Sequence, residues 1–245
     1  MTISEKLTAI AENQVKIYNH GKDNGLKEGY ANCENDFWDN IQNFGNRTDY
    51  VKAFSNWSKA QYIRPKYKIM PTAATTYLLN GCSSLKKLEK DYFDFSLIPE
   101  NYTEYNQGLY ALCNNCSSLE EVEDVNFQPV MSYAYFFAGC ENLKKIAVLR
   151  VSEKSSFGGT TGGDCFWRCS SLEDVTIEGT IGKNFSIQSS TKLSHESLMN
   201  IIECLKDYSD DTSGKVYTLT LGKKNTAKLS EEEQQIAIDK GWLLV

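Results

Sequence analysis

A short phrase that recurs four times constrains the fold of this chain more than any other feature. In each copy a cysteine follows an apolar residue by three or four positions, a leucine follows the cysteine by three, and another apolar residue comes three later. The repeat positions are Cys82, Leu85, Cys116, Leu119, Cys140, Leu143, Cys169 and Leu172. Successive cysteines are 34, 24 and 29 residues apart. Such a period is typical of arrays in which each repeat is one small structural unit stacked on the next.

The fold class predicted from this pattern is α/β, a short solenoid with a parallel β-sheet. Two copies of the phrase are followed by segments with a large apolar residue at every second position, Ile146–Val148 and Val175–Ile177. Alternation of this kind indicates strands, and stacked units bring such strands side by side.

The repeat cysteines are predicted to be buried structural thiols. A cysteine can act as a compact hydrophobe in a tight turn, and one thiol in each stacked unit gives a row of sulfurs instead of a tetrahedral cage. Metal ligation and disulfides remain alternatives for the four. The other cysteines share no frame with the repeat and are taken as incidental: Cys33, Cys113, Cys165 and Cys204.

The phrase resembles the BspA-type leucine-rich repeat over about residues 77–177. The stretch from Phe185 to Trp242 resembles the C-terminal end of leucine-rich-repeat proteins encoded in bacteriophage and prophage tail regions. The opening Ile3–Asn13, with Asn46–Tyr50 further on, resembles the same proteins. The resemblance implies adhesion and recognition and brings no catalytic residues.

Residues 1–66 are expected to form an N-terminal helix and an aromatic-rich segment that attaches or caps the repeats. The first helix has apolar residues at helical spacing after a capping box at Thr2 and Glu5. These residues are Ile3, Leu7, Ile10 and Ile17. They either pack on the chain itself or form a short coiled-coil seam, which would hold several copies together as a homo-oligomer such as a trimer.

The repeat region is assigned to residues 67–193 and a C-terminal αβ cap to residues 194–245. Ser194 is expected to cap a helix that carries Leu198, Ile201, Ile202 and Leu205, followed by a strand over 216–221. Ser230 and Glu233 form a second capping box, and Gly241 ends that helix. A helix-strand cap suits a repeat array, whose last unit otherwise exposes its apolar end.

Charged pairs of alternating sign follow the repeat leucines. They are Lys86 and Lys87, Glu120 and Glu121, Lys144 and Lys145, and Glu173 and Asp174. In stacked strands about 4.8 Å apart these pairs would lie beside one another as opposite charges and fix the register. A charged-ligand site is the less favoured interpretation, because alternating signs cancel the field that would attract a ligand.

Composition argues against several functional classes. The net charge of −6 does not suit binding to nucleic acid, no apolar run is long enough to span a bilayer, and the opening lacks the features of a secretory signal. Only two histidines are present, His20 and His195, and the glycine-rich stretch 158–163 lacks the lysine of a phosphate loop. We therefore expect no catalytic residues, no cofactor and no metal, and predict a protein that is not an enzyme.

The remaining interpretation is recognition by an extended surface. The candidate ligand-binding residues are aromatic or arginine side chains outside the repeat frame, the types that dominate interfaces. They are Tyr102, Tyr105, Tyr110, Tyr133, Tyr135, Trp167 and Arg168. Alternatively, these side chains simply cover the core.

Together these features predict a receptor-binding protein of a phage or prophage tail. Assembly in the host cytoplasm would place it in the virion, where it contacts a host cell-surface protein or glycan. The alternatives are a structural tail or baseplate component whose repeats dock other virion proteins, and an adhesin of the bacterial cell surface.

Overall fold

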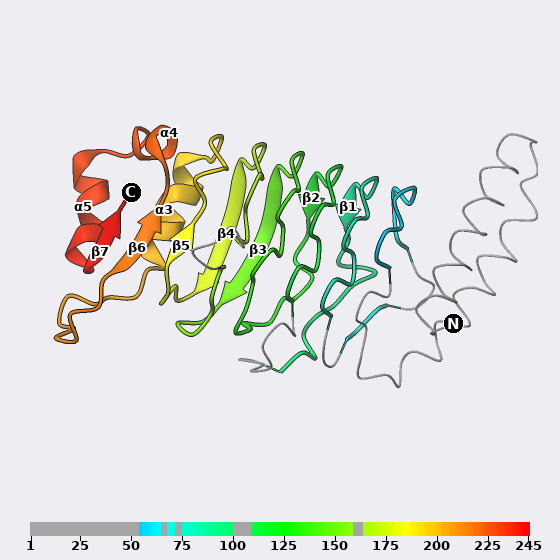
Figure 1. Ribbon diagram of the computed structural model, residues 1–245, viewed down its shortest axis with the longest axis horizontal. Helices are drawn as coiled ribbons and strands as arrows, with labels where there is room; N and C mark the ends of the chain where they lie inside the picture. The colour runs from blue at the N-terminus through cyan, green and yellow to red at the C-terminus, as the bar shows by residue number, and fades with distance from the viewer. Residues whose placement is uncertain (1–53, 65–67, 72–74, 100–108, 159–163) are drawn as a thin grey trace, which may run out of the picture.

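A computed structural model of the chain describes residues 54–64, 68–71, 75–99, 109–158 and 164–245. In these residues the fold is α/β, with two parallel sheets and few helices. The segments follow one another along the long axis of an elongated body, in the order of the sequence (Figure 1). The predicted α/β class with a parallel sheet is confirmed.

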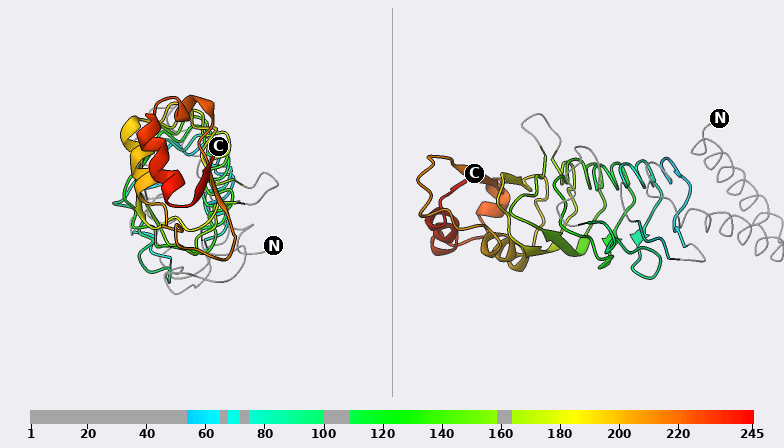
Figure 2. Two further views of the ribbon diagram at one scale, coloured as in Figure 1. Left: turned by 90° about the vertical axis from the view of Figure 1, so that its left-hand side faces the viewer. Right: turned by 90° about the horizontal axis from the view of Figure 1, so that it is seen from below.

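The larger sheet has four strands in the order in which they occur in the chain. They are β1 (Lys87–Leu88), β2 (Glu121–Val122), β3 (Lys145–Val151) and β4 (Asp174–Gly179). Each begins at the end of one copy of the repeated phrase, and the strand segments expected at 146–148 and 175–177 lie within β3 and β4. The strands lie along one side of the molecule and a row of turns lies along the opposite side (Figure 2, right).

Each copy of the phrase folds as a tight turn that leads into its strand, and we call this segment a unit. The repeat cysteines and leucines are all fully buried, as predicted. The thiol of each cysteine donates a hydrogen bond to a carbonyl oxygen of the preceding unit. The contacts are Cys82 to Phe54 at 3.0 Å, and Cys116 to Leu79, Cys140 to Cys113 and Cys169 to Phe137 at 3.1 Å each.

Two cysteines taken as incidental belong to the same core. Cys113 and Cys165 are fully buried and stand at the two apolar positions that precede the repeat cysteine. Cys113 occupies the position of Leu79, three residues before the repeat cysteine, and Cys165 occupies that of Leu78, one residue earlier. The expectation for these two was wrong because a thiol fills an apolar position as well as a small hydrocarbon side chain does.

A further unit precedes the four found by sequence. In residues 54–63, Trp57 takes the place of the cysteine and Ala60 the place of the leucine. The backbone of Phe54 donates to Leu78 O at 2.9 Å, and Lys86 N donates to Gln61 O at 2.9 Å. This segment, grouped above with the N-terminal part, therefore stacks on the Cys82 unit in the same register.

In the first unit described and the four found by sequence, the turn passes through a left-handed backbone conformation at the residue just before the cysteine position. The residues in this row are Asn56, Gly81, Asn115, Gly139 and Arg168, with φ between 59° and 79°. Asparagine and glycine are the residues that adopt this conformation at least cost. Gly81 and Gly139 are also required by space, because a Cβ atom there would overlap the Oδ1 atoms of Asn56 and Asn115 in the preceding units.

The core between the sheet and the turns contains a continuous chain of aromatic rings. Consecutive centroids lie 4.2 to 6.4 Å apart from the first unit described to the start of the C-terminal part. The chain runs through Phe54, Phe93, Phe95, Phe127, Phe136, Phe137, Phe166 and Phe185. Because the rings come from successive units, they link all the units through one apolar interior.

Helix α3 (His195–Glu203) closes the edge of the larger sheet that β4 would otherwise leave open. Ser197 Oγ accepts a hydrogen bond from Val175 N at 2.9 Å, and Asn200 Oδ1 accepts one from Ile177 N at 2.7 Å. Side chains of the helix thus satisfy two backbone donors of β4, which hinders another strand from adding there. The predicted helix and its Ser194 cap are confirmed, but the helix ends at Glu203 and does not include Leu205.

The C-terminal part adds a three-stranded parallel sheet. It consists of β5 (Phe185–Ser186), β6 (Tyr217–Thr220) and β7 (Trp242–Leu244), with the short α4 (Lys223–Thr226) and α5 (Glu231–Asp239). The capping box at Ser230 and the left-handed Gly241 after α5 are present as predicted. Helix α4 was not predicted, because its four residues are too few to show a helical period.

Candidate functional site

Three tyrosines on successive units form a row of half-buried rings. Tyr77 and Tyr110 have ring centroids 5.5 Å apart, and Tyr110 and Tyr135 have centroids 5.8 Å apart. Both pairs meet edge to face, with interplanar angles of 81° and 72°. We call these residues the tyrosine row. Two of the sequence-predicted ligand residues, Tyr110 and Tyr135, are therefore brought together beside a third tyrosine that the sequence reasoning missed.

The backbone fixes the tyrosine row in place. Tyr77 N donates to Tyr110 O at 3.1 Å, and Ala111 N donates to Ala134 O at 3.0 Å. Tyr77 and Tyr135 both have left-handed backbones, with φ of 60° and 57°. Their shared position, two residues before the same apolar position of each unit, is the signal that could have identified Tyr77.

Trp167 and Arg168 form a second exposed group on the Cys169 unit. The Trp167 side chain is 45% exposed, and the Arg168 guanidinium lies 5.4 Å from the centre of its ring. The guanidinium also forms an ion pair with Glu141 on the preceding unit. A large aromatic side chain held open to solvent beside a cation has the composition of an interface anchor.

Tyr133 is not a surface residue, and its prediction as a ligand contact was wrong. It is fully buried, its ring stacks on Phe157 with centroids 5.5 Å apart, and its hydroxyl donates to the carbonyl oxygens of Gln128 and Arg150. Burial raises the pKa of this hydroxyl. Tyr133 therefore supports the core and the backbone of β3.

Several predicted residues lie outside the described residues. They are the ligand candidates Tyr102 and Tyr105 and the oligomerisation candidates Ile3, Leu7, Ile10 and Ile17.

The charged pairs on the sheet lie in the predicted register. Lys87 is paired in the sheet with Glu121, Glu121 with Lys145, and Lys145 with Asp174. Lys86 Nζ lies 3.2 Å from a carboxylate oxygen of Glu120, and Lys144 Nζ lies 3.3 Å from the other oxygen of the same carboxylate. These two lysines hold the pKa of Glu120 below its usual range.

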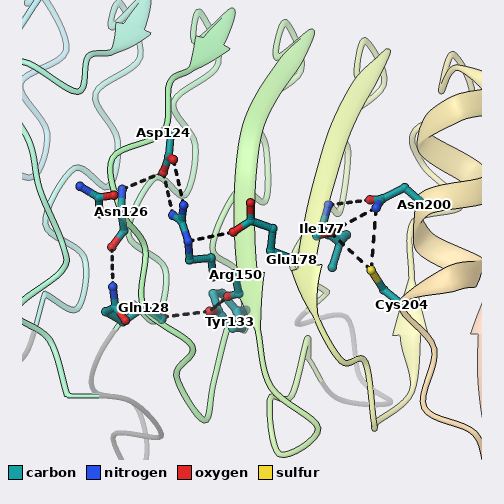
Figure 3. A network of polar contacts seen from close by, with 9 residues as sticks. All are labelled: Asp124, Asn126, Gln128, Tyr133, Arg150, Ile177, Glu178, Asn200 and Cys204. Carbon is teal, nitrogen blue, oxygen red and sulfur yellow. Dashed lines mark hydrogen bonds and ion pairs between the residues drawn. The ribbon is translucent and has the colours of Figure 1, made fainter.

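A second group of charges lies on β3 and its neighbours (Figure 3). Arg150 donates to both carboxylate oxygens of Asp124, at 2.7 and 2.9 Å, and its Nε lies 3.0 Å from Glu178. Hydrogen bonding by Arg150 holds the pKa of Asp124 below its usual range. Because Arg150 contacts one carboxylate after β2 and one on β4, it links β3 to the segments on both sides of it.

The same view shows how the network ends toward α3. Asn200 Nδ2 donates to Ile177 O at 3.2 Å, and the half-buried Cys204 thiol lies 3.4 Å from the same oxygen (Figure 3). Both groups complete the cover of the β4 edge.

The described residues were also searched for a metal site and for a membrane-spanning helix. In the described parts of the chain, no three His, Cys, Asp or Glu side chains gather in a way that could hold a metal ion. Helices in the same parts are too short and too polar to cross a membrane. His195 lies at the start of α3, with Nε2 2.8 Å from the Glu233 carboxylate on α5, so it joins two helices of the C-terminal part.

Comparison with known proteins gave no relatives: no family model, no curated protein and no solved structure matches this chain.

Proposed function

We propose that this chain is a recognition module without enzymatic activity, built as a short solenoid of BspA-type leucine-rich repeats. The repeat architecture is supported by one contact that occurs in all four units. In each, the cysteine thiol donates a hydrogen bond to a carbonyl oxygen of the unit before it, with sulfur–oxygen distances of 3.0 to 3.1 Å. The same backbone contacts join each pair of neighbouring units, which is the defining property of a repeat array.

The observation that carries the recognition role is the contrast between two surfaces. On the sheet, opposite charges engage one another along the strands and leave little net field. Elsewhere the units present the tyrosine row and the exposed Trp167 with Arg168. Rigid aromatic side chains bury much area at small entropic cost when a partner covers them, and this favours the second surface for binding.

The proposed setting is the tail of a bacteriophage or prophage, with a molecule of the host cell surface as the partner. This part rests on the resemblance of the chain's two ends to tail-region leucine-rich-repeat proteins.

The test is to remove the anchors without disturbing the fold. Trp167→Ala removes the exposed ring, and Arg168→Gly replaces the left-handed arginine with the residue that stands in the same row at Gly81 and Gly139. The double variant should reduce binding of the labelled protein to host cells by roughly tenfold or more while the melting temperature stays nearly unchanged.

Tyr62→Ala is the matched control, because Tyr62 is an aromatic residue of similar exposure, 47%, on another unit. Loss of cell binding in the control as well would indicate a nonspecific effect of removing surface rings. Full binding by the double variant, combined with co-assembly with tail proteins, would favour the structural role instead.

A further inference from the structure

We propose that two copies of this chain associate tail to tail through the free edge of β7, with their β7 strands antiparallel across a two-fold axis. The inference is independent of the proposed function. Its basis is an open strand edge, an exposed apolar face, and charges that complement one another under this symmetry.

The smaller sheet has an open edge at β7, whereas helix α3 covers the β4 edge of the larger sheet. Among the described residues, β7 pairs in a sheet with β6 alone. Val245, next to the strand, directs both its backbone groups to β6: its N–H donates to Leu219 O at 2.9 Å, and its carbonyl accepts from Leu221 N at 2.8 Å. Because these groups alternate in direction along a strand, those of Leu244 point to the open edge. Figure 2, left, looks onto this end of the molecule and shows α5 and β7 side by side, facing the viewer (red).

The residues of β7 lack the features that usually protect an edge strand. Exposed edges in soluble proteins commonly carry a charged residue, a proline or a bulge, and the sequence from Trp242 to Val245 has no charged side chain and no proline. On the same face of the sheet, β6 presents the half-buried Thr218, whereas its partner in β7 is Leu243, which is 52% exposed. Val245 beside it is 55% exposed. The face therefore changes from polar to apolar at the strand that is last in the sheet.

The start of β7 lies beside a negatively charged loop. Tyr208 N donates to Lys240 O, two residues before the strand, at 2.9 Å. The loop around Tyr208 carries three exposed carboxylates, those of Asp207, Asp210 and Asp211. Two lysines of this region are engaged elsewhere: Lys206 is paired with Glu153 at 2.8 Å, and the Lys240 amine donates to carbonyl oxygens at the end of α3.

The other end of β7 lies beside a positively charged turn. Gly222 N donates to Val245 O at 3.1 Å, and α4 begins at the next residue with the exposed Lys223 and Lys224. Figure 1 shows α4 and the loop that precedes β6 on opposite sides of β7. The same strand edge therefore has negative charge at its start and positive charge at its end.

These charges suit an antiparallel pair of identical edges. A two-fold axis at Leu243 brings the start of each β7 beside the end of the other, so the acidic loop of each copy faces the two α4 lysines of its partner. In this register Leu243 meets its own counterpart as a non-hydrogen-bonded pair, in which side chains come closest. The backbone groups of Trp242 and Leu244 then exchange hydrogen bonds across the axis. A parallel pair would place like charges together.

Sedimentation equilibrium of the full chain, at about 1 µM to 1 mM, measures the association. At high concentration we expect the parent to have about twice the mass of Leu243→Lys, because this change puts two ammonium groups face to face and should weaken association roughly tenfold or more. Leu97→Lys is the matched control, since Leu97 is 49% exposed in an earlier unit, and it should associate as the parent does. A parent that stays monomeric would overturn the inference. An assembly that persists unchanged in Leu243→Lys would also overturn it, by showing that another part of the chain joins the copies.

A charge exchange tests the antiparallel arrangement. Lys223→Glu with Lys224→Glu makes both ends of the edge acidic, and Asp210→Lys with Asp211→Lys makes both ends basic. Each double variant alone should associate roughly tenfold more weakly than the parent at low salt. An equal mixture of the two should recover the association, because each contact across the axis then joins opposite charges. If both variants keep the melting temperature of the parent and their mixture still fails to associate, the proposed arrangement is wrong.

Discussion

The side chain of Asn115 lies directly over Gly139 of the next unit, so close that a Cβ atom at Gly139 would overlap Asn115 Oδ1. Both residues have left-handed backbones, with φ of 59° and 79°. We expect Gly139→Ala to lower the free energy of unfolding by about 1 to 3 kcal/mol, because it adds both an overlap and a strained backbone. Chemical denaturation measures the change.

The pair also provides its own control. Asn115→Gly removes the overlapping atoms, so Gly139→Ala should cost less in that background, and the difference is the coupling between the two sites. Equal costs in both backgrounds would show that the two side chains do not share this space.

Ser190 offers a stabilising substitution. It stands in the cysteine position of the segment after the Cys169 unit, and its backbone makes the same turn contact, Ser190 N to Ile187 O at 2.9 Å. Its Oγ is buried and has no hydrogen-bond partner among the described residues. Ser190→Cys should raise the free energy of unfolding by about 1 kcal/mol, because a buried thiol costs less to remove from water than an unpaired hydroxyl. An unchanged or lower stability would contradict this view of the position.

The thiols should differ sharply in reactivity. Burial raises the pKa of Cys113, Cys116, Cys140 and Cys165 and thus disfavours the reactive thiolate, while Cys204 is only half-buried. In a Cys33→Ser background, a thiol reagent should modify Cys204 first in the folded protein and the remaining six cysteines only on unfolding. Mass spectrometry of partially labelled protein identifies the site, and early labelling of a repeat cysteine would show that its unit is open.

Reversing the charges of one lysine pair on the sheet should make the stability of the fold depend on salt. With Lys144 and Lys145 changed to Glu, carboxylates would lie beside Glu120, Glu121 and Asp174. We expect a fall of a few degrees in melting temperature at low ionic strength and a smaller fall at about 1 M salt, where charges are screened within about 3 Å. Reversing Glu120 and Glu121 to Lys in the same chain should recover part of the loss. A fall that does not respond to salt would show that the loss comes from packing instead of charge.

Acid should weaken the contact between Asp124 and Arg150. Because Arg150 lowers the pKa of Asp124 in the folded state, the carboxylate stabilises the fold above its ordinary pKa of about 3.9, and this stabilisation is lost as the pH falls through the lower folded value. Asp124→Asn should lower the free energy of unfolding by about 1 to 2 kcal/mol at pH 7, a modest figure because the side chain is 36% exposed.

The difference between Asp124→Asn and the parent should shrink below about pH 4, as the parent also loses its carboxylate. Urea titrations at a series of pH values measure it. A difference that stays constant down to about pH 2 would mean that Arg150 does not act through the charge of Asp124.

Sequence reasoning succeeded where one residue type marks one position. Residues such as Cys82 and Leu85 recur in every copy of the phrase, and their positions predicted the register of the sheet and of its charges. It failed where a different side chain fills the same space. Three positions of the phrase are held by residues that do not resemble it: Trp57, Ala60 and Ser190. Whether a large ring or a small hydroxyl fits at such a position depends on how the neighbouring unit packs.

The surface was harder to predict than the core. Tyr133 and Tyr135 are two residues apart and were treated alike, yet one is fully buried and the other half-exposed. The left-handed backbone at Tyr135 turns the chain between them, and no local pattern of hydrophobicity signals that turn. The same conformation at Tyr77 aligns it with Tyr135, which is why the tyrosine row emerged only from the structure.

The uniform joint between units has a consequence for the length of the molecule. The Cys116 thiol bonds to the Cys82 unit in the same way as the Cys140 thiol bonds to the Cys116 unit. The contacts between neighbouring units are therefore equivalent. Duplication or loss of a whole unit would then alter the distance between the two ends without requiring a new interface. A protein made in this way can change its reach in steps of one unit while its terminal parts remain as they are.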